Sequence, residues 1–172
     1  MSVNEPTIRQ GTTDDAAELL EIYRPIVEST SISFELEVPT VEEFARRIEV
    51  SNEKHLWLVA EIGGALAGYA YAGSHRARAA YGYSTEVSAY LHADFRGQGL
   101  GSTLYNKLFD ELEDYPYFHA YAGITMPNDA SVGLHKSVGF SFVGTFENVG
   151  FKYNQWHAVS WWYRQLKPGL PT

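Results

Sequence analysis

The alternation of apolar and polar residues along the chain predicts four helices and seven strands. Apolar residues recur every three or four positions in four stretches, which we expect to be helices: about 15–27, the segment that begins at Thr40, about 100–114 and about 128–138. Alternating or short continuous apolar runs predict strands over 7–10, 56–62, 65–73, 86–92, 119–124, 140–146 and 156–166. Helices come first, an antiparallel stretch follows, and strands then alternate with helices. This order predicts an α/β fold around one mixed sheet.

Local signals refine the boundaries of these elements. Pro25 lacks a backbone N–H and should bend or end the first helix. Thr40 and Glu43 have the spacing of a capping box, which predicts that the second helix starts there. A polar connection through Gly150 and Asn154 is expected between the last two strands.

Composition narrows the class of protein. A length of 172 residues suits one domain spanning 1–172, and a hydrophobic content of 45% suits a globular chain. No run approaches the roughly 20 apolar residues that a membrane span needs, so no membrane partner is expected. Residues 1–6 lack the basic start and apolar run of a secretory signal, so we expect a cytoplasmic location.

Charge and residue types exclude several kinds of chemistry. The chain has no cysteine, which excludes disulfides and thiolate catalysis, and its six histidines are scattered, so no metal is expected. The net charge of -8 argues against general nucleic-acid binding, which needs a basic face. An anionic ligand must therefore be held by a local feature of the chain.

One such feature lies between a predicted strand and a predicted helix. Backbone N–H groups at a helix start are unsatisfied and can hold phosphate oxygens, and glycine lets a ligand approach the backbone. This segment is not a dinucleotide fingerprint or a Walker P-loop, because the further glycine and the Gly-Lys-Ser/Thr of those motifs are missing. A glycine-rich turn that feeds a helix is the alternative. The segment consists of Arg96, Gly97, Gln98, Gly99, Leu100 and Gly101.

With the segment 128–140, this loop resembles the GNAT acetyltransferase superfamily, whose signature is Arg/Gln-x-x-Gly-x-Gly/Ala. The likeness runs from about Thr7 to Leu166 and is closest to the phosphinothricin and methionine sulfoximine/sulfone acetyltransferases. It rests further on the segments 30–34, 76–81, 99–105, 127–129 and 150–152. The resemblance implies a mixed, mostly antiparallel sheet of about seven strands flanked by about four helices. It also implies acetyl-CoA as co-substrate, with no metal.

The resemblance assigns catalytic roles to two side chains. Acetyl transfer to an amine needs a base for the ammonium proton, a donor for the carbonyl oxygen and a proton for the departing thiolate. Glu86 matches the general base of the subfamily, and its alternative is a solvated glutamate on a strand. His135 stands where many GNAT proteins carry a proton-donating tyrosine. It could protonate the thiolate or order water, or it could be a histidine packed at a helix end.

The remaining implied contacts concern the cofactor. GNAT proteins open the strand before the phosphate loop at a bulge, so the amides near Ser88, Ala89 and Tyr90 should hold the pantetheine arm. Asn128 would bind the cofactor arm or the substrate, and its alternative is a helix N-cap.

The expected substrate contacts lie on the loops. Arg76 and Arg78 could hold an α-carboxylate, phosphinate or sulfoximine group, and their alternative is a solvated basic loop. His75 and Phe34 are expected in the same pocket. The subfamily commonly forms homodimers, so part of an aromatic C-terminal group is expected at an interface, although a filled core would also explain it. This group comprises Phe151, Tyr153, Trp156, Trp161, Trp162 and Tyr163.

The sequence predicts the first of three functions, and the other two are its alternatives. The first is an N-acetyltransferase acting on the α-amine of a small amino-acid-like molecule. The second is a GNAT enzyme for another amine, such as a polyamine, an aminoglycoside or a protein terminus. The third is a non-catalytic acyl-CoA-binding module.

Overall fold

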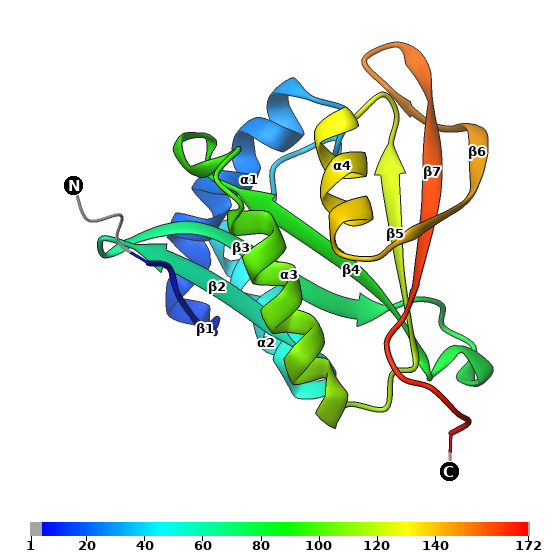
Figure 1. Cartoon of the computed structure of the whole chain (residues 1–172). Coiled ribbons are helices and arrows are strands. Elements are labelled where there is room, and N and C mark those ends of the chain that lie inside the picture. The colour runs from blue at the N-terminus through cyan, green and yellow to red at the C-terminus, as the bar shows by residue number, and fades with distance from the viewer. Residues whose placement is uncertain (1–4, 172) are drawn as a thin grey trace.

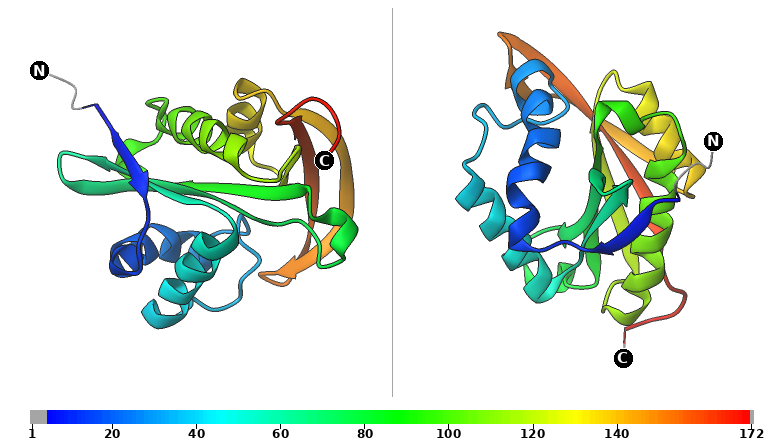
Figure 2. Two further views of the ribbon diagram at one scale, coloured as in Figure 1. Left: turned by 90° about the horizontal axis from the view of Figure 1, so that it is seen from below. Right: turned by 90° about the vertical axis from the view of Figure 1, so that its left-hand side faces the viewer.

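The computed structural model describes residues 5–171, and its helices lie on both faces of one sheet. Figures 1 and 2 show α1 and α2 on one face and α3 and α4 on the other. The helices are α1 (Ala16–Ser29), α2 (Val41–Lys54), α3 (Leu100–Glu111) and α4 (Asp129–Ser137). The strands are β1 (Thr7–Gln10), β2 (Trp57–Ile62), β3 (Ala65–Ser74), β4 (Ser84–Leu91), β5 (His119–Thr125), β6 (Ser141–Lys152) and β7 (Gln155–Gln165). Residues 1–4, on which the expectation about a secretory signal partly rests, lie outside the described part.

The sheet is mixed and mostly antiparallel, as the sequence predicts. Its strand order is β1-β2-β3-β4-β5-β7-β6. Neighbouring strands pair antiparallel except for β4 and β5, which are parallel. This parallel pair joins the N-terminal antiparallel half of the sheet to the C-terminal half, and the candidate site lies beside it.

Apolar helix faces pack on the two faces of the sheet. Phe44 and Ile48 of α2 are buried with Leu19 of α1 against one face. Leu104 and Leu108 of α3 are fully buried against the other. The sheet is thereby packed between two apolar layers.

Pro25 does not end the first helix, which corrects one of the two effects predicted for this residue. The helix continues through Pro25 to Ser29. Pro25 is exposed, so the carbonyl that loses its intrahelical hydrogen bond can be solvated instead. The second helix begins as predicted, because the Thr40 hydroxyl accepts a hydrogen bond from the backbone N–H of Glu43.

The C-terminal strands correct a second prediction. The sequence suggested a polar connection through Gly150 and Asn154, but β6 continues through Gly150 to Lys152. Two residues with positive φ, Tyr153 at 53° and Asn154 at 58°, form the tight turn into β7. Such a turn suits the twist of a hairpin. The result is a long hairpin at the edge of the sheet, shown in orange and red in Figure 1.

In the part of the chain from residue 5 to 171, no helix is long and apolar enough to cross a membrane. Within the same residues, no group of three or more His, Asp or Glu side chains could hold a metal ion.

Candidate active site

The loop between β4 and α3 has the backbone of an anion-binding site. Gly97 and Gly99 adopt positive φ values of 71° and 83°, which other residues adopt only with strain. A Cβ atom on either glycine would meet nothing within 4 Å, so open space lies above the backbone. Gly99 is the N-cap residue of α3, where N–H groups lack helical partners. This loop can therefore receive a phosphate group.

A cleft of about 540 Å³ opens beside this loop, between the end of β4 and α4. Most of the predicted cofactor contacts line it. These are Ala89, Tyr90, Arg96, Gly97, Gly99, Leu100, Gly101 and Asn128. Gln98 does not line the cleft, because its side-chain amide donates to the Asp94 carbonyl at 2.9 Å. Asn128 also serves as the N-cap of α4, since its Oδ1 accepts from the backbone N–H of Ser131.

The cleft exists because β4 and β5 separate. Their pairing covers Ser84–Glu86 of β4 and His119–Tyr121 of β5 and ends there. Figure 1 shows the two strands diverging toward the end where α4 lies. The β3–β4 register is continuous through this region, so the opening comes from divergence of the strands without a bulge against β3. A narrow cavity of about 50 Å³ fills the gap and is lined by Ser88, Ala89 and Tyr90, the strand residues expected to hold the cofactor arm.

Glu86 lies at the last paired position, where the two strands begin to part. Its Oε1 accepts a hydrogen bond from Nδ1 of His75 at 2.8 Å and lies 3.5 Å from the Arg76 guanidinium. The Glu86 side chain is 33% exposed. The predicted base thus has one oxygen engaged by donors and remains open to solvent.

His135 is buried, and both of its ring nitrogens have partners. Nδ1 lies 2.7 Å from the Ser131 carbonyl, so we infer that Nδ1 carries the proton. Nε2 then accepts from the Tyr105 hydroxyl at 3.1 Å. Burial lowers the pKa of His135 below its ordinary value of 6.5, which favours the neutral ring. This geometry favours a packing or ordering role over direct proton donation.

The other predicted substrate residues lie apart from Glu86. Arg78 is exposed at the start of a short 3₁₀ helix, Ala79–Tyr81. Phe34 packs on the hairpin, where a Cβ on Gly150 would lie only 2.2 Å from its ring, and it also contacts His157. The structure therefore brings His75 and Arg76 to Glu86, but it does not group Phe34 and Arg78 with them.

Sequence reasoning missed two features of the site. Ser131 and Leu134 line the cleft with Asn128, and their helical spacing on α4 was the available signal. Lys152 is buried, and its ammonium donates to the carbonyls of Val27 and Ser33 at 2.7 and 2.9 Å. It thereby fastens the α1–α2 loop to the hairpin. A lysine in a predicted polar connection gives no signal of this role.

A comparison with protein families identifies the family of this chain. The family described as Acetyltransferase (GNAT) domain matches residues 8–161. The chain belongs to the GNAT acetyltransferase family. As the sequence predicts, it is therefore an enzyme of the acyltransferase class.

Several GNAT relatives are similar over almost their whole length. The phosphinothricin N-acetyltransferase of Streptomyces viridochromogenes is 36% identical, over 95% of this chain and 90% of that protein. The L-methionine sulfoximine/L-methionine sulfone acetyltransferase of Salmonella typhimurium is 32% identical, over 93% and 94%. A crystal structure of a GNAT superfamily phosphinothricin acetyltransferase from Sinorhizobium meliloti, in complex with AcCoA, has a TM-score of 0.92 and 31% identity. That likeness covers 97% of this chain and 93% of the other.

Gly99→Val should abolish acetyl-CoA binding, because a side chain at this position blocks the approach of a phosphate and strains the backbone. Isothermal titration calorimetry measures the dissociation constant. Gly64→Val is the matched control, since Gly64 has a similar φ of 86° and open space around it but lies in the β2–β3 turn. Both variants should lose similar thermal stability, and only Gly99→Val should lose binding. Unchanged affinity in Gly99→Val would mean that the phosphate loop is misplaced.

Proposed function

We propose that the chain transfers the acetyl group of acetyl-CoA to the α-amine of a small amino-acid-like substrate, of the phosphinothricin, methionine sulfoximine or methionine sulfone type. Glu86 acts as the general base. The observation that carries this proposal is the position of Glu86 on β4, at the point where this strand leaves β5 and the cleft begins. A single strand thus supplies both the base and the wall along which the thioester would lie.

The cleft fits an acyl-CoA by its chemistry. The pyrophosphate would lie against the N–H groups of the 97–101 loop, and Arg96 at the rim adds a positive charge. The pantetheine arm is a peptide-like chain and would pair with backbone groups of β4 beyond Glu86, where β5 has moved away. A backbone N–H in this stretch would donate to the thioester carbonyl oxygen, where negative charge develops.

Glu86 would act on the amine that enters from the other side of the gap. The substrate arrives as an ammonium, and Glu86 takes its proton, directly or through one water. The amine nitrogen then bonds to the acetyl carbon and the carbon–sulfur bond breaks. The second proton of the nitrogen passes through water to the departing thiolate, so that free CoA leaves as the thiol. His135 does not deliver a proton directly in this proposal. It holds the Tyr105 hydroxyl at the wall of the narrow cavity.

Arg76 is the favoured contact for the anionic group of the substrate. Its guanidinium lies beside Glu86 and 5.7 Å from the centre of the Trp161 ring. The indole N–H of Trp161 is buried and has no hydrogen-bond partner within residues 5–171. A carboxylate, phosphinate or sulfoximine group would accept from Arg76, and it would reach the Trp161 N–H only after the side chains that cover this atom move. Arg78 is exposed on the same β3–β4 connection and would contact the substrate only if this connection closes over it.

The test is release of free thiol from acetyl-CoA with a panel of amines. The panel holds phosphinothricin, methionine sulfoximine, methionine sulfone, common amino acids, spermidine and an aminoglycoside. We expect fast release with the first three. Turnover of spermidine or the aminoglycoside alone would assign another GNAT substrate, and silence with acetyl-CoA still bound would support a binding module.

In the same assay, Glu86→Gln should lower kcat roughly 100-fold or more and leave acetyl-CoA affinity unchanged, because the amide cannot accept the proton. Glu61→Gln is a control for the loss of one negative charge on a strand, since Glu61 lies on β2 and pairs with Arg9. An unchanged rate in Glu86→Gln would remove Glu86 from the mechanism.

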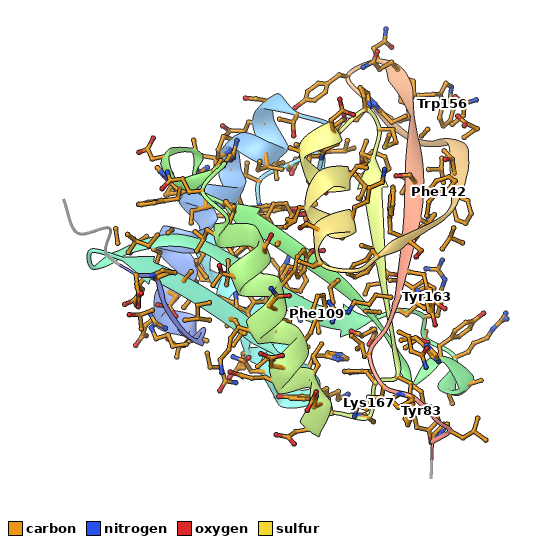
Figure 3. All side chains as sticks on the ribbon, viewed as in Figure 1. Tyr83, Phe109, Phe142, Trp156, Tyr163 and Lys167 are labelled. Carbon is orange, nitrogen blue, oxygen red and sulfur yellow. The ribbon has the colours of Figure 1, made fainter. Side chains whose placement is uncertain are left out.

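We also propose a homodimer through the β6–β7 hairpin. β6 is the edge strand of the sheet, and a second copy could cover it through the same surface by two-fold symmetry. Phe142 and Trp156 lie along this edge in Figure 3. Of the predicted aromatic group, Trp162 is buried in the core. The apolar side chains of the hairpin that are at least half exposed are Phe142, Val143, Phe146, Val149, Phe151, Tyr153 and Trp156. A cytoplasmic location remains part of this proposal.

The double variant Phe151→Asp/Trp156→Asp should be a monomer, because these two rings contact each other on the exposed hairpin and their replacement puts charge into the interface. Sedimentation should give twice the 19.3 kDa chain mass for the wild type and the chain mass for the variant. Val41→Asp, at an exposed apolar residue that begins α2, should leave the dimer intact. A wild-type monomer or a dimeric double variant would contradict the proposed interface.

A further inference from the structure

The loop after β3 carries a histidine whose ring is fixed by four other elements. The His75 ring stacks on Tyr121 of β5, with ring centres 4.7 Å apart and planes 17° apart. Tyr81 and Trp161 meet it edge-on at 5.6 and 6.3 Å. Its side chain is only 14% exposed. An imidazole held on three sides by aromatic rings has little freedom to change its rotamer.

The fixed ring has one polar contact within residues 5–171, and an ionised Glu86 carboxylate can only accept in it. Its Nδ1 lies 2.8 Å from Oε1 of Glu86 on β4. The strand registers fix the distance between the two backbones, because Glu86 lies opposite Gly73 on one side and Tyr121 on the other. Gly73 has no side chain that could fill the space between the loop and the carboxylate. The ring that stacks on His75, that of Tyr121, therefore lies on a strand that pairs directly with β4 at Glu86.

A carboxylate that serves as a base needs one oxygen directed at the proton that it removes. A carboxylate on a strand end can otherwise rotate about its terminal bond, which is a soft torsion. A fixed N–H donor on Oε1 removes this freedom and leaves Oε2 for the amine or its bridging water. Oε2 has no hydrogen bond within residues 5–171, and the Glu86 side chain is one-third exposed.

We propose that His75 is a positioning residue for the catalytic base: its Nδ1–H holds Oε1 of Glu86 and directs Oε2 toward the amine. This inference rests on the proposed function, in which Glu86 takes the proton. It differs from the sequence expectation, which gave His75 a place in the substrate pocket. Arg76, 3.5 Å from the same oxygen, lies at the solvent side of the pair and is half exposed.

Three substitutions distinguish the effect of the Nδ1–H donor from the effect of ring packing. His75→Phe keeps an aromatic ring against Tyr121 and removes the donor. His75→Asn places an amide N–H near the position of Nδ1, whereas His75→Gln places it near Nε2. If His75 acts by its Nδ1–H, His75→Phe should lower kcat about 10- to 100-fold, as expected for loss of alignment at a reacting group. The KM for the amine and the dissociation constant of acetyl-CoA should change less than about threefold, because the ring makes no contact with the cleft.

The asparagine and glutamine variants should differ in kcat. His75→Asn should recover most of the wild-type kcat, and His75→Gln should remain slow. The control is His119→Phe. His119 lies on β5 and, like His75, is surrounded by aromatic rings, but it is hydrogen-bonded to Tyr163. This substitution should leave kcat unchanged. Equal rates in His75→Asn and His75→Gln would overturn the proposal, even if His75→Phe does not fold.

A double-mutant cycle tests whether His75 acts through Glu86. In the Glu86→Gln background, His75→Phe should cost no further activity, because the group that it positions has already lost its function. A full additional loss in that background would show that His75 acts independently and would overturn the inference. If Glu86→Gln is slow but His75→Phe has the wild-type kcat, the inference about His75 is wrong and the proposed role of Glu86 stands. An unimpaired Glu86→Gln enzyme would remove the proposed base itself.

Discussion

The divergence of β4 from β5 is the structural constraint on which the site depends. The two strands share only three paired positions before they part. Backbone groups that lose their strand partner inside a protein need another one, and a peptide-like cofactor arm can supply it. The same divergence brings the starts of α3 and α4 to one cleft, because each helix follows one of the two strands. The separation of these two strands thus opens a groove and places the N-terminus of α3, which can bind an anion, beside it.

The proposed base lies where this pairing ends. Glu86 occupies the last paired position, so its backbone is held by strands on both sides, and its side chain is one-third exposed. Two connections far apart in sequence complete this region. The loop after β3 brings His75 and Arg76 to the carboxylate, and buried Lys152 of the hairpin fastens the α1–α2 loop. If the hairpin also forms the dimer interface, dimerisation would help to fix the position of the α1–α2 loop, because Lys152 joins this loop to the hairpin.

The sequence predicted the elements and the glycine turn before α3 well, because both depend on local chemistry. Apolar periodicity located the helices and strands, and two glycines before a helix located the turn that needs positive φ. The errors came from non-local effects. Pro25 is tolerated because its side of α1 faces solvent, and Gly150 continues a strand because Phe34 packs against it. The bond between His75 and Glu86 joins residues 11 apart and depends on strand register, which a single sequence does not specify.

The most direct test of this account is backbone hydrogen exchange, measured by mass spectrometry with and without acetyl-CoA. The account predicts that the cofactor slows exchange in two segments, the 97–101 loop and the part of β4 beyond Glu86, because the ligand accepts hydrogen bonds from both. The hairpin turn at Tyr153 and Asn154 should exchange at the same rate in both states. Slower exchange in the loop alone, with β4 unaffected, would contradict the claim that the separated strand holds the thioester arm.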